Sequence, residues 1–394
     1  MTSHWEFTYG GDYVRRGDRR SAIPFLARSI YDRNGTKPAF ELMQMLNRTG
    51  VQIAVIGQAF PYMPDCQIPV GMFRDLSFGN PREARWQECG RSAEEGAELC
   101  RVLSSRITVL MWNRKPASRV KGIDVNPHLG ILRCIALELP EPIQVNKTML
   151  IASGSNGKFV SRLDLDVRDG AVKDFGYRLI PVFSDVITPD AEVAALIDEV
   201  RAPYEDDLAR KLATTDGTLY RRGNFNGTWD DMICDALLSQ RDAEIALSPG
   251  FRWGPSLVPG QDITFEDLHN ATAMTYPAAY RSQMTGEFLK VILEDVCDNL
   301  FNPDPYYQQG GDMVRVGGMG YRIDVKAPAG ERISDMTHLA TGKPIDPSRE
   351  YTVAGWASVN EETEGPPIWD VVEAHLADVK TVSPKDNSAI EVVL

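Results

Sequence analysis

The sequence lacks the marks of several common protein classes. No run approaches the roughly 18 apolar residues that a membrane-spanning helix needs, so we expect no membrane association. Its six cysteines are scattered and form no Cys-x-x-Cys pair, which argues against a disulfide scaffold or a zinc ribbon. His269, His338 and His375 have no companions at metal-ligand spacing and are predicted to be structural or surface residues. No internal repeat or low-complexity tract is present.

The charge balance excludes a further class. A formal net charge of -13 argues against non-specific binding of nucleic acid. The hydrophobic share of 43% and the charged share of 25% are those of an ordinary globular protein. At 394 residues the chain exceeds the roughly 250–300 residues that one core supports, which predicts two domains.

The most informative segment runs from Tyr306 to Gly318 and reads Tyr-Tyr-Gln-Gln-Gly-Gly-Asp-Met-Val-Arg-Val-Gly-Gly. Paired glycines allow unusual dihedrals or the close approach of another group. Neighbouring tyrosines supply a flat wall, and Arg315 supplies a fork of donors suited to an oxyanion. The segment therefore predicts a loop for an anionic ligand, with an ordinary turn between a helix and a strand as the alternative.

The first half of the chain has α/β character. Residues 51–57 form a short apolar run that ends in glycine, typical of a buried strand. Leu150 and Ile151 begin a strand that runs into a glycine-rich turn, and residues 159–167 alternate as in a half-buried strand. From Pro189 to about Thr214 the pattern is that of a charge-rich helix, with Val193, Leu196, Val200 and Leu208 as its apolar stripe.

The second half places glycine-bearing loops beside regular elements. Residues 221–229 precede a helix that Thr228 is expected to cap. A strand over 243–247 leads into the loop 248–254, and a helix capped by Thr285 leads to the tyrosine loop. Asn224 lies in the first of these loops, where it either contacts a ligand or orients the helix.

Residues from about 215 to 394 resemble the C-terminal domain of the 5′-nucleotidase superfamily, and most closely its sulfur-oxidising SoxB branch. The resemblance is carried by the segments 221–229, 248–254, 259–268 and 302–307. The wider family has Asn-Gly-Gly-Gly-Ile-Arg where this chain has Ser-Pro-Gly-Phe-Arg over 248–252, a difference that disfavours a nucleotide substrate. Substrate-binding residues implied by the resemblance are Asn224, Phe251, Arg252, Trp253, Tyr306, Tyr307, Gly310, Gly311, Asp312 and Arg315. For Asp312 and Arg315, pairing with each other is the alternative.

The first half also resembles this branch. Residues 40–64 and 151–167 are similar to the later part of its metallophosphoesterase domain, and residues 4–10 to a Gly-His-Trp-Glu-Phe segment with Ser3 in place of the glycine. His4 is therefore a candidate metal ligand, with a solvated histidine as the alternative. The expected fold is mixed α/β and α+β: a remnant of a four-layer metallophosphoesterase domain over 1–188, a linker helix over 189–214 and a 5′-nucleotidase-type C-terminal domain over 215–394.

What the resemblance implies for chemistry is a thiosulfohydrolase with two manganese ions. Such enzymes release sulfate from a cysteine S-thiosulfonate on the SoxYZ carrier protein during thiosulfate oxidation in the periplasm. Paired metals activate a water and clamp the oxygens of a displacement. Arg252 would hold the sulfonate oxygens.

Several parts of the family's metal centre are missing. The Asp-x-His and Gly-Asp motifs would lie before Met1, residues 1–7 show no signal-peptide layout, and we expect an incomplete chain. The Ser-His-Asn-Gly and Gly-His-Thr-His motifs are replaced over 104–116 and 126–139, where His128 is the one histidine. We therefore expect impaired hydrolysis. A nucleotidase or cyclic phosphodiesterase, and a non-catalytic remnant that binds the carrier, are the competing interpretations.

We hypothesise that residues 104–116 and 126–139 are translated from shifted reading frames. The gene sequence tests this, and we expect another frame of the codons for residues 105–113 to spell His-Asn-Gly. Codons that cannot spell this motif in any frame would contradict the hypothesis.

Overall fold

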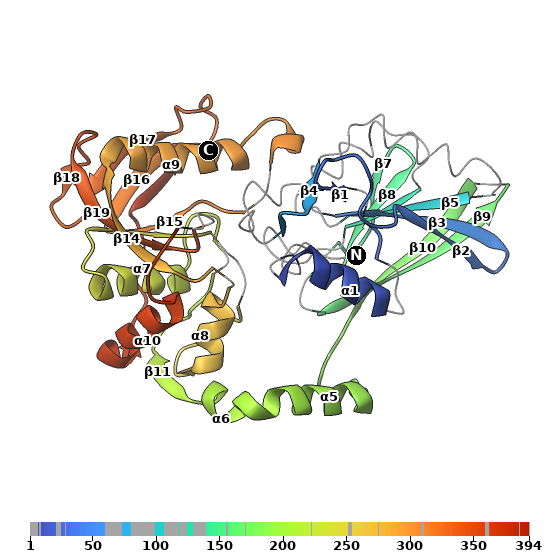
Figure 1. Cartoon of the computed structure of the whole chain (residues 1–394), viewed down its shortest axis with the longest axis horizontal. Coiled ribbons are helices and arrows are strands. Elements are labelled where there is room, and N and C mark those ends of the chain that lie inside the picture. Colours follow the sequence, from blue (N-terminus) through green and yellow to red (C-terminus); the bar gives the residue numbers. More distant parts are fainter. Residues whose placement is uncertain are drawn as a thin grey trace. The chain divides into compact units, whose positions relative to one another are not determined.

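The structure is a computed structural model, and it describes most of the second half of the chain and parts of the first. The described residues are 7, 9–20, 25–27, 29–59, 73–79, 99–105, 118, 124–128, 139–154, 157–169, 171–221, 223–250, 254–274, 276–308, 311–358, 362–385 and 387–393. The chain divides into two compact units, Met1–Thr188 and Pro189–Leu394 (Figure 1). No helix in these ranges combines the length and apolar character needed to cross a membrane.

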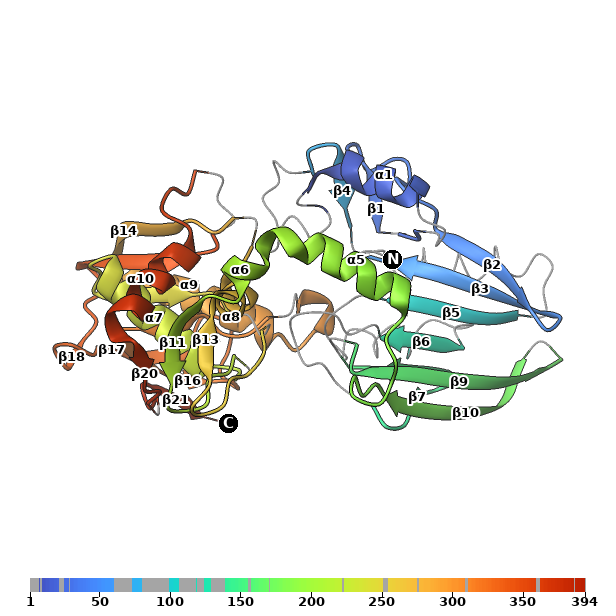
Figure 2. The ribbon, with the colours of Figure 1, turned by 90° about the horizontal axis from the view of Figure 1, so that it is seen from below.

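The first unit is built on a six-stranded mixed sheet with the order β2-β3-β5-β6-β8-β7 (Figure 2). Its central strands β3, β5, β6 and β8 are parallel, and β2 and β7 pair antiparallel at the edges. The bounds are β2 Met43–Arg48, β3 Val51–Gln58, β5 Leu99–Ser105, β6 Val125–His128, β7 Ile143–Val145 and β8 Thr148–Ala152. Parallel neighbours of this kind are typical of α/β domains, which confirms the expected fold class.

A long hairpin packs against this sheet. β9 (Phe159–Arg168) and β10 (Ala171–Pro181) pair antiparallel. Leu163, Leu165 and Val167 point from β9 toward buried Met149 and Ile151, as the predicted alternation requires. The same unit also contains α1 (Gly11–Arg20) and the antiparallel pair β1 (Ile30–Asp32) and β4 (Leu76–Phe78). These elements enclose a small aromatic core that consists of Phe7, Val14, Phe25, Ala27, Ile30, Phe40, Ala59, Phe73 and Leu76.

The segment that was expected to be one helix from 189 to 214 is shorter and is broken. α5 spans Ala191–Arg201 and begins at Asp190, whose carboxylate accepts from the backbone N–H groups of Glu192 and Val193. A 3₁₀ turn, η3 (Ala202–Tyr204), contains Pro203 and separates α5 from α6 (Glu205–Leu208). Lys211–Thr215 then forms strand β11 rather than helix, because its backbone pairs with β13 and β20.

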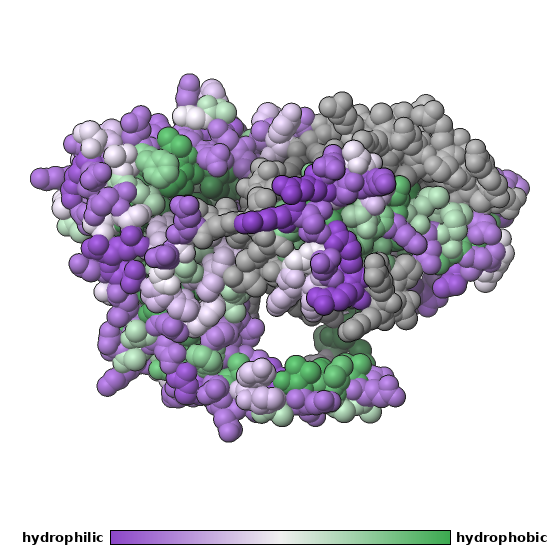
Figure 3. All heavy atoms as spheres, viewed as in Figure 1, coloured by the Kyte–Doolittle hydropathy of each residue, from purple (hydrophilic) through white to green (hydrophobic). Residues whose placement is uncertain are grey.

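The apolar stripe of α5 faces solvent. Val193, Leu196, Ile197 and Val200 are each at least half exposed, and no residue of α5 is buried. In Figure 3 hydrophobic atoms line this helix at the lower edge of the view. Helical periodicity alone would have predicted a buried face here.

The second unit contains three sheets. The central one has the order β14-β19-β12-β15, a second has β18-β17-β16-β21, and a smaller one has β13-β11-β20. Their bounds are β12 Ile245–Ser248, β13 Asp262–Thr264, β14 Ala279–Thr285, β15 Arg315–Gly317, β16 Met319–Asp324, β17 Ile333–His338, β18 Lys343–Pro344, β19 Glu350–Trp356, β20 Thr381–Val382 and β21 Ile390–Val393. The helices are α7 Thr228–Gln240, α8 Phe265–Thr272, α9 Gly286–Leu300, α10 Ile368–Val379 and the short η4 Pro305–Tyr307.

Helices cover both faces of the central sheet. Ile245 and Leu247 of β12 pack with Leu289 and Leu293 of α9. α7 contacts β12 and β15 and is in turn covered by α10. Successive strand residues point to opposite faces, so the fully buried run of β12 serves both helices.

Helix starts show one confirmed prediction and one error. Thr285 caps α9, since its side chain accepts from the N–H of Phe288. Thr228 does not cap α7, whose N-cap is Gly227. Its hydroxyl instead donates to the carbonyl of Thr218 and accepts from the N–H of Tyr220, which ties the helix start to the preceding strand-like segment.

A pair of Leu→Ala substitutions tests this assignment of buried and exposed helix faces. Leu293 of α9 is fully buried and Leu196 of α5 is 57% exposed. We expect Leu293→Ala to lower the free energy of unfolding by about 3–5 kcal/mol, through lost burial and a new cavity. Leu196→Ala should change it by less than about 0.5 kcal/mol. Urea unfolding measures both, and a large loss for Leu196→Ala would contradict its exposure.

Candidate functional site

One edge of the central sheet in the second unit gathers the predicted site loops. β12 and β19 are parallel, so both end at this edge, at Ser248 and Trp356. β15 and β14 are antiparallel to them and therefore begin there. The residues that directly follow β12 and β19 and those that directly precede β14 and β15 thus lie at the carboxyl ends of two parallel strands, which is where open α/β sheets bind ligands.

The two parallel strand ends are joined by side chains. The indole N–H of Trp356 donates to the Ser248 hydroxyl at 2.8 Å, and both residues are buried. A buried indole needs such an acceptor, because leaving its N–H unpaired costs free energy. Ser248 begins the predicted loop, so this bond fixes where that loop leaves the sheet.

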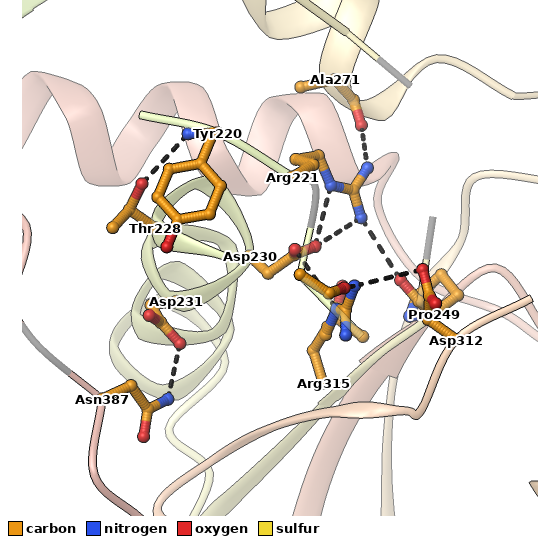
Figure 4. A network of polar contacts seen from close by, with 12 residues as sticks. Tyr220, Arg221, Thr228, Asp230, Asp231, Pro249, Ala271, Asp312, Arg315 and Asn387 are labelled. Carbon is orange, nitrogen blue, oxygen red and sulfur yellow. Dashed lines mark hydrogen bonds and ion pairs between the residues drawn. The ribbon is translucent and has the colours of Figure 1, made fainter. Parts of the chain in front are cut away.

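A buried carboxylate at the start of α7 lies beneath these loops (Figure 4). Asp230 is 0% exposed and pairs with two arginines that are 2% or less exposed. Its Oδ1 lies 2.7 Å from Nη2 and 2.8 Å from Nε of Arg221. Its Oδ2 lies 3.3 Å from Nε of Arg315. One carboxylate therefore neutralises parts of two guanidinium groups at once.

Both arginines also reach loop backbones. Arg221 donates to the carbonyl of Pro249 at 3.3 Å and to that of Ala271 at 2.6 Å. Arg315 donates to the carbonyl of Gly223 and lies 3.6 Å from the carboxylate of Asp312. Charge-assisted bonds of this kind are stronger than bonds between neutral groups, so the network connects the helix start to three loops.

Backbone packing brings the same three loops into contact. The N–H of Met313 donates to the carbonyl of Asn224 at 3.1 Å. A Cβ added at Gly250 would lie 2.5 Å from the carbonyl oxygen of Met313, so only glycine fits there. Gly311 has a φ of +100°, a conformation that other residues avoid. Gly250 thus serves close backbone approach, and Gly311 serves a backbone conformation with positive φ.

The predicted site residues are placed as follows. Phe251, Arg252, Trp253, Gly310 and His4 lie outside the described residues, although Gly250 and Gly254 bound the Arg252 loop on both sides. The backbone of Tyr306 lies in η4, and Tyr307 beside it is 67% exposed. Asn224 contributes its backbone carbonyl to the contact with Met313.

Arg315 and Asp312 occupy the interior rather than the surface. Arg315 is 1% exposed and Asp312 6% exposed, and they form the pair that was the alternative to substrate binding. Sequence reasoning did not single out Arg221, Asp230 or Trp356. One signal was available for Asp230, because it precedes the buried Ile233 and Leu237 at i+3 and i+7 and so falls on the buried stripe of the helix.

No metal centre lies within the described ranges. No group of three or more His, Cys, Asp or Glu side chains comes together in them. The segments to which the resemblance assigns metal ligands, at residue 4 and over 104–116 and 126–139, fall mostly outside these ranges. The network around Asp230 does not fit a cation, because its two carboxylates already face two arginines.

The residue after Asp230 titrates abnormally. Burial, together with the charges of the neighbouring Asp230 and Asp235, raises the pKa of Asp231 to about 6, while the hydrogen bond from Asn387 and the charge of Arg315 oppose this shift. That bond, from the Asn387 amide at 2.7 Å, ties α7 to the segment before β21. Burial likewise raises the pKa of the Cys234 thiol, which makes this thiol a poor nucleophile.

Asp231→Asn tests whether the buried negative charge of Asp231 on α7 destabilises the fold. A carboxyl group whose pKa is raised on folding destabilises the fold as pH rises through about 6. We therefore expect the variant to gain stability relative to the parent chain between pH 4 and pH 8, by on the order of 1 kcal/mol after a discount for solvent screening. Urea unfolding at both pH values measures it. An equal difference at the two pH values would contradict the shift.

Comparison with known proteins places the chain in a family. Residues 211–369 match the family model of the 5′-nucleotidase C-terminal domain. The sulfate thiohydrolase SoxB of Thermus thermophilus, solved in complex with glycerol, superposes with a TM-score of 0.91 at 31% identity, over 99% of this chain and 72% of that chain.

Two further relatives agree with this. A 5′-nucleotidase precursor from Thermus thermophilus superposes with a TM-score of 0.82 at 16% identity, over 99% of this chain and 82% of that chain, and shows the fold alone. Protein UshA of Yersinia enterocolitica is 21% identical over 398 residues, which cover 89% of this chain and 68% of that protein. The chain therefore belongs to the 5′-nucleotidase/metallophosphoesterase superfamily of hydrolases.

Proposed function

We propose that the chain is a SoxB-type hydrolase that acts on a cysteine S-thiosulfonate of the SoxYZ carrier and releases sulfate, with reduced activity. The observation that carries this proposal is the likeness to SoxB, with 31% identity over 99% of the chain. The nucleotidase with the same fold shares 16%. The same branch supports the periplasm as the compartment in which the protein acts.

The loop after β12 supports a sulfonate rather than a nucleotide substrate. Ser-Pro-Gly-Phe-Arg over 248–252 stands where nucleotidases have Asn-Gly-Gly-Gly-Ile-Arg. In this chain the hydroxyl of Ser248 accepts from Trp356 and the carbonyl of Pro249 accepts from Arg221. Both groups are thereby committed to the protein interior, which leaves recognition to the residues that follow them.

In the proposed complex Arg252 holds the sulfonate. A guanidinium fork matches two oxygens of an oxyanion, and the bonds are charge-assisted. Tyr307, with 67% of its surface exposed, and Tyr306 would supply an aromatic wall along which the carrier tail lies. Asp312 and Arg315 support this surface from below and do not touch the substrate.

The resemblance to the SoxB branch implies two manganese ions, which are part of the proposed function. When bound, they would polarise the sulfonate and supply an activated water. This chain lacks the histidines of two metal motifs, over 104–116 and 126–139. That observation favours a second candidate, a protein that binds the carrier without hydrolysing it.

Sulfate release and peptide binding separate these possibilities. The probe is a synthetic glycine-rich peptide with a terminal cysteine S-thiosulfonate. We expect the purified chain with manganese to release sulfate close to the background rate and to bind the peptide. Arg252→Ala should weaken binding by about tenfold or more, the loss of one charge-assisted contact.

The control is Arg322→Ala, which removes an arginine that is half exposed and pairs with Glu391 on β21. It should leave binding unchanged. Rapid manganese-dependent sulfate release would overturn the reduced activity. Hydrolysis of 5′-AMP without peptide binding would replace the whole proposal by a nucleotidase.

A further inference from the structure

We propose that Asp230 is the positioning residue of the substrate site. It contacts no substrate and acts through Arg221 and Arg315, which contact Pro249 before the Arg252 segment and Asp312 in the tyrosine loop. This inference rests on the proposed function for the identity of the substrate. The loop arrangement itself can be tested without it.

Two arginines share the carboxylate of Asp230. Oδ1 of Asp230 faces Arg221 and Oδ2 faces Arg315, with all three side chains 1% exposed or less. Figure 4 shows Asp230 between the two guanidinium groups, at the first turn of α7. Without its charge both arginines would lose the carboxylate that they share, while Asp312 would still pair with Arg315.

Each arginine also bonds backbone carbonyls of other segments. Arg221 bonds the carbonyl of Pro249, two residues before Phe251, and the carbonyl of Ala271 at the end of α8. Arg315 bonds the carbonyl of Gly223 and pairs with Asp312, which follows the Gly-Gly pair of the tyrosine loop. Asp230 is therefore linked through the arginines to one residue beside each segment, Pro249 before Phe251 and Asp312 after the Gly-Gly pair.

Burial of this charged network costs free energy. Two arginines and two aspartates balance in charge, but their burial is expensive and is repaid only when every group is satisfied. Among the described residues, Nη1 of Arg315 is buried without a hydrogen-bond partner, and Oδ2 of Asp230 has an ion pair but no hydrogen bond. Apolar side chains would stabilise this position at least as well. What they could not supply is a charged partner for the arginines that bond the carbonyls of Pro249, Ala271 and Gly223.

The consequence concerns precision at the substrate. A binding group displaced by about 1 Å loses much of its effect on an oriented substrate. Gly250 packs directly on the carbonyls of Asp312 and Met313, so a shift of either loop displaces the other. Loss of the Asp230 charge should therefore disturb both substrate-binding segments together while the core around α9 remains intact.

The experiment compares Asp230→Asn with Asp231→Asn in the full chain. Asp231 is the next residue on the same helix, and its carboxylate contacts Asn387 instead of the arginines, so its variant controls for loss of one acidic charge. Trypsin cleavage after Arg252, identified by mass spectrometry in the folded protein, reports release of the loop. We expect Asp230→Asn to accelerate this cleavage about tenfold or more, since cleavage follows the population of the open loop.

Peptide affinity supplies the second readout. The Kd for the S-thiosulfonate peptide should rise about tenfold or more in Asp230→Asn and stay unchanged in Asp231→Asn. If Asp230→Asn does not fold, Arg221→Lys takes its place, because lysine keeps the charge opposite Asp230 but cannot bond Pro249 and Ala271 together.

Each outcome bears on one claim. Cleavage after Arg252 that is no faster in Asp230→Asn or Arg221→Lys than in the parent chain overturns the positioning role. If cleavage is faster in Asp230→Asn than in the parent chain, and the parent chain does not bind the peptide, the positioning role is supported and the proposed substrate is refuted. Equal acceleration by Asp231→Asn assigns the effect to charge on α7 in general and also overturns the proposal.

Discussion

The candidate site depends on one buried carboxylate that two buried arginines share. Asp230 sits at the first turn of α7, and through Arg221 and Arg315 it fixes carbonyls in the segments around Pro249, Ala271 and Gly223. Buried charges are tolerated only when they are paired. The three loops and the helix start must therefore be placed together, because no one of these charges can be satisfied while the others are displaced.

The sheet beneath makes this convergence possible. Parallel β12 and β19 end at the same edge, and antiparallel β14 and β15 begin there. Packing on both faces, by α9 on one and α7 on the other, holds the strand ends rigid. The bond from Trp356 to Ser248 locks the two parallel strands at the point where their loops depart. A rigid edge of this kind lets irregular loops present side chains with a defined geometry.

The likeness to SoxB extends over 99% of the chain, whereas the altered metal motifs are confined to two stretches of it. The missing histidines belong to the first unit, in stretches 104–116 and 126–139. In the proposed function, binding of a sulfonate-bearing tail and its hydrolysis are separable properties, since the first needs loop geometry and the second needs a filled metal cage.

The sequence by itself determined the family resemblance, the α/β class of the first unit, the alternating strand β9, the cap of α9 at Thr285 and the location of three glycine-bearing loops. These are local signals, because periodicity, caps and glycine pairs act within a few residues. Tertiary structure decided that Lys211–Thr215 is a strand, that the stripe of α5 stays exposed and that Arg315 is buried. It also decided that Asp230 joins the loops. Each of these outcomes depends on residues far away in the sequence. The residues next to a charged side chain in the sequence do not show which distant opposite charge will pair with it in the interior.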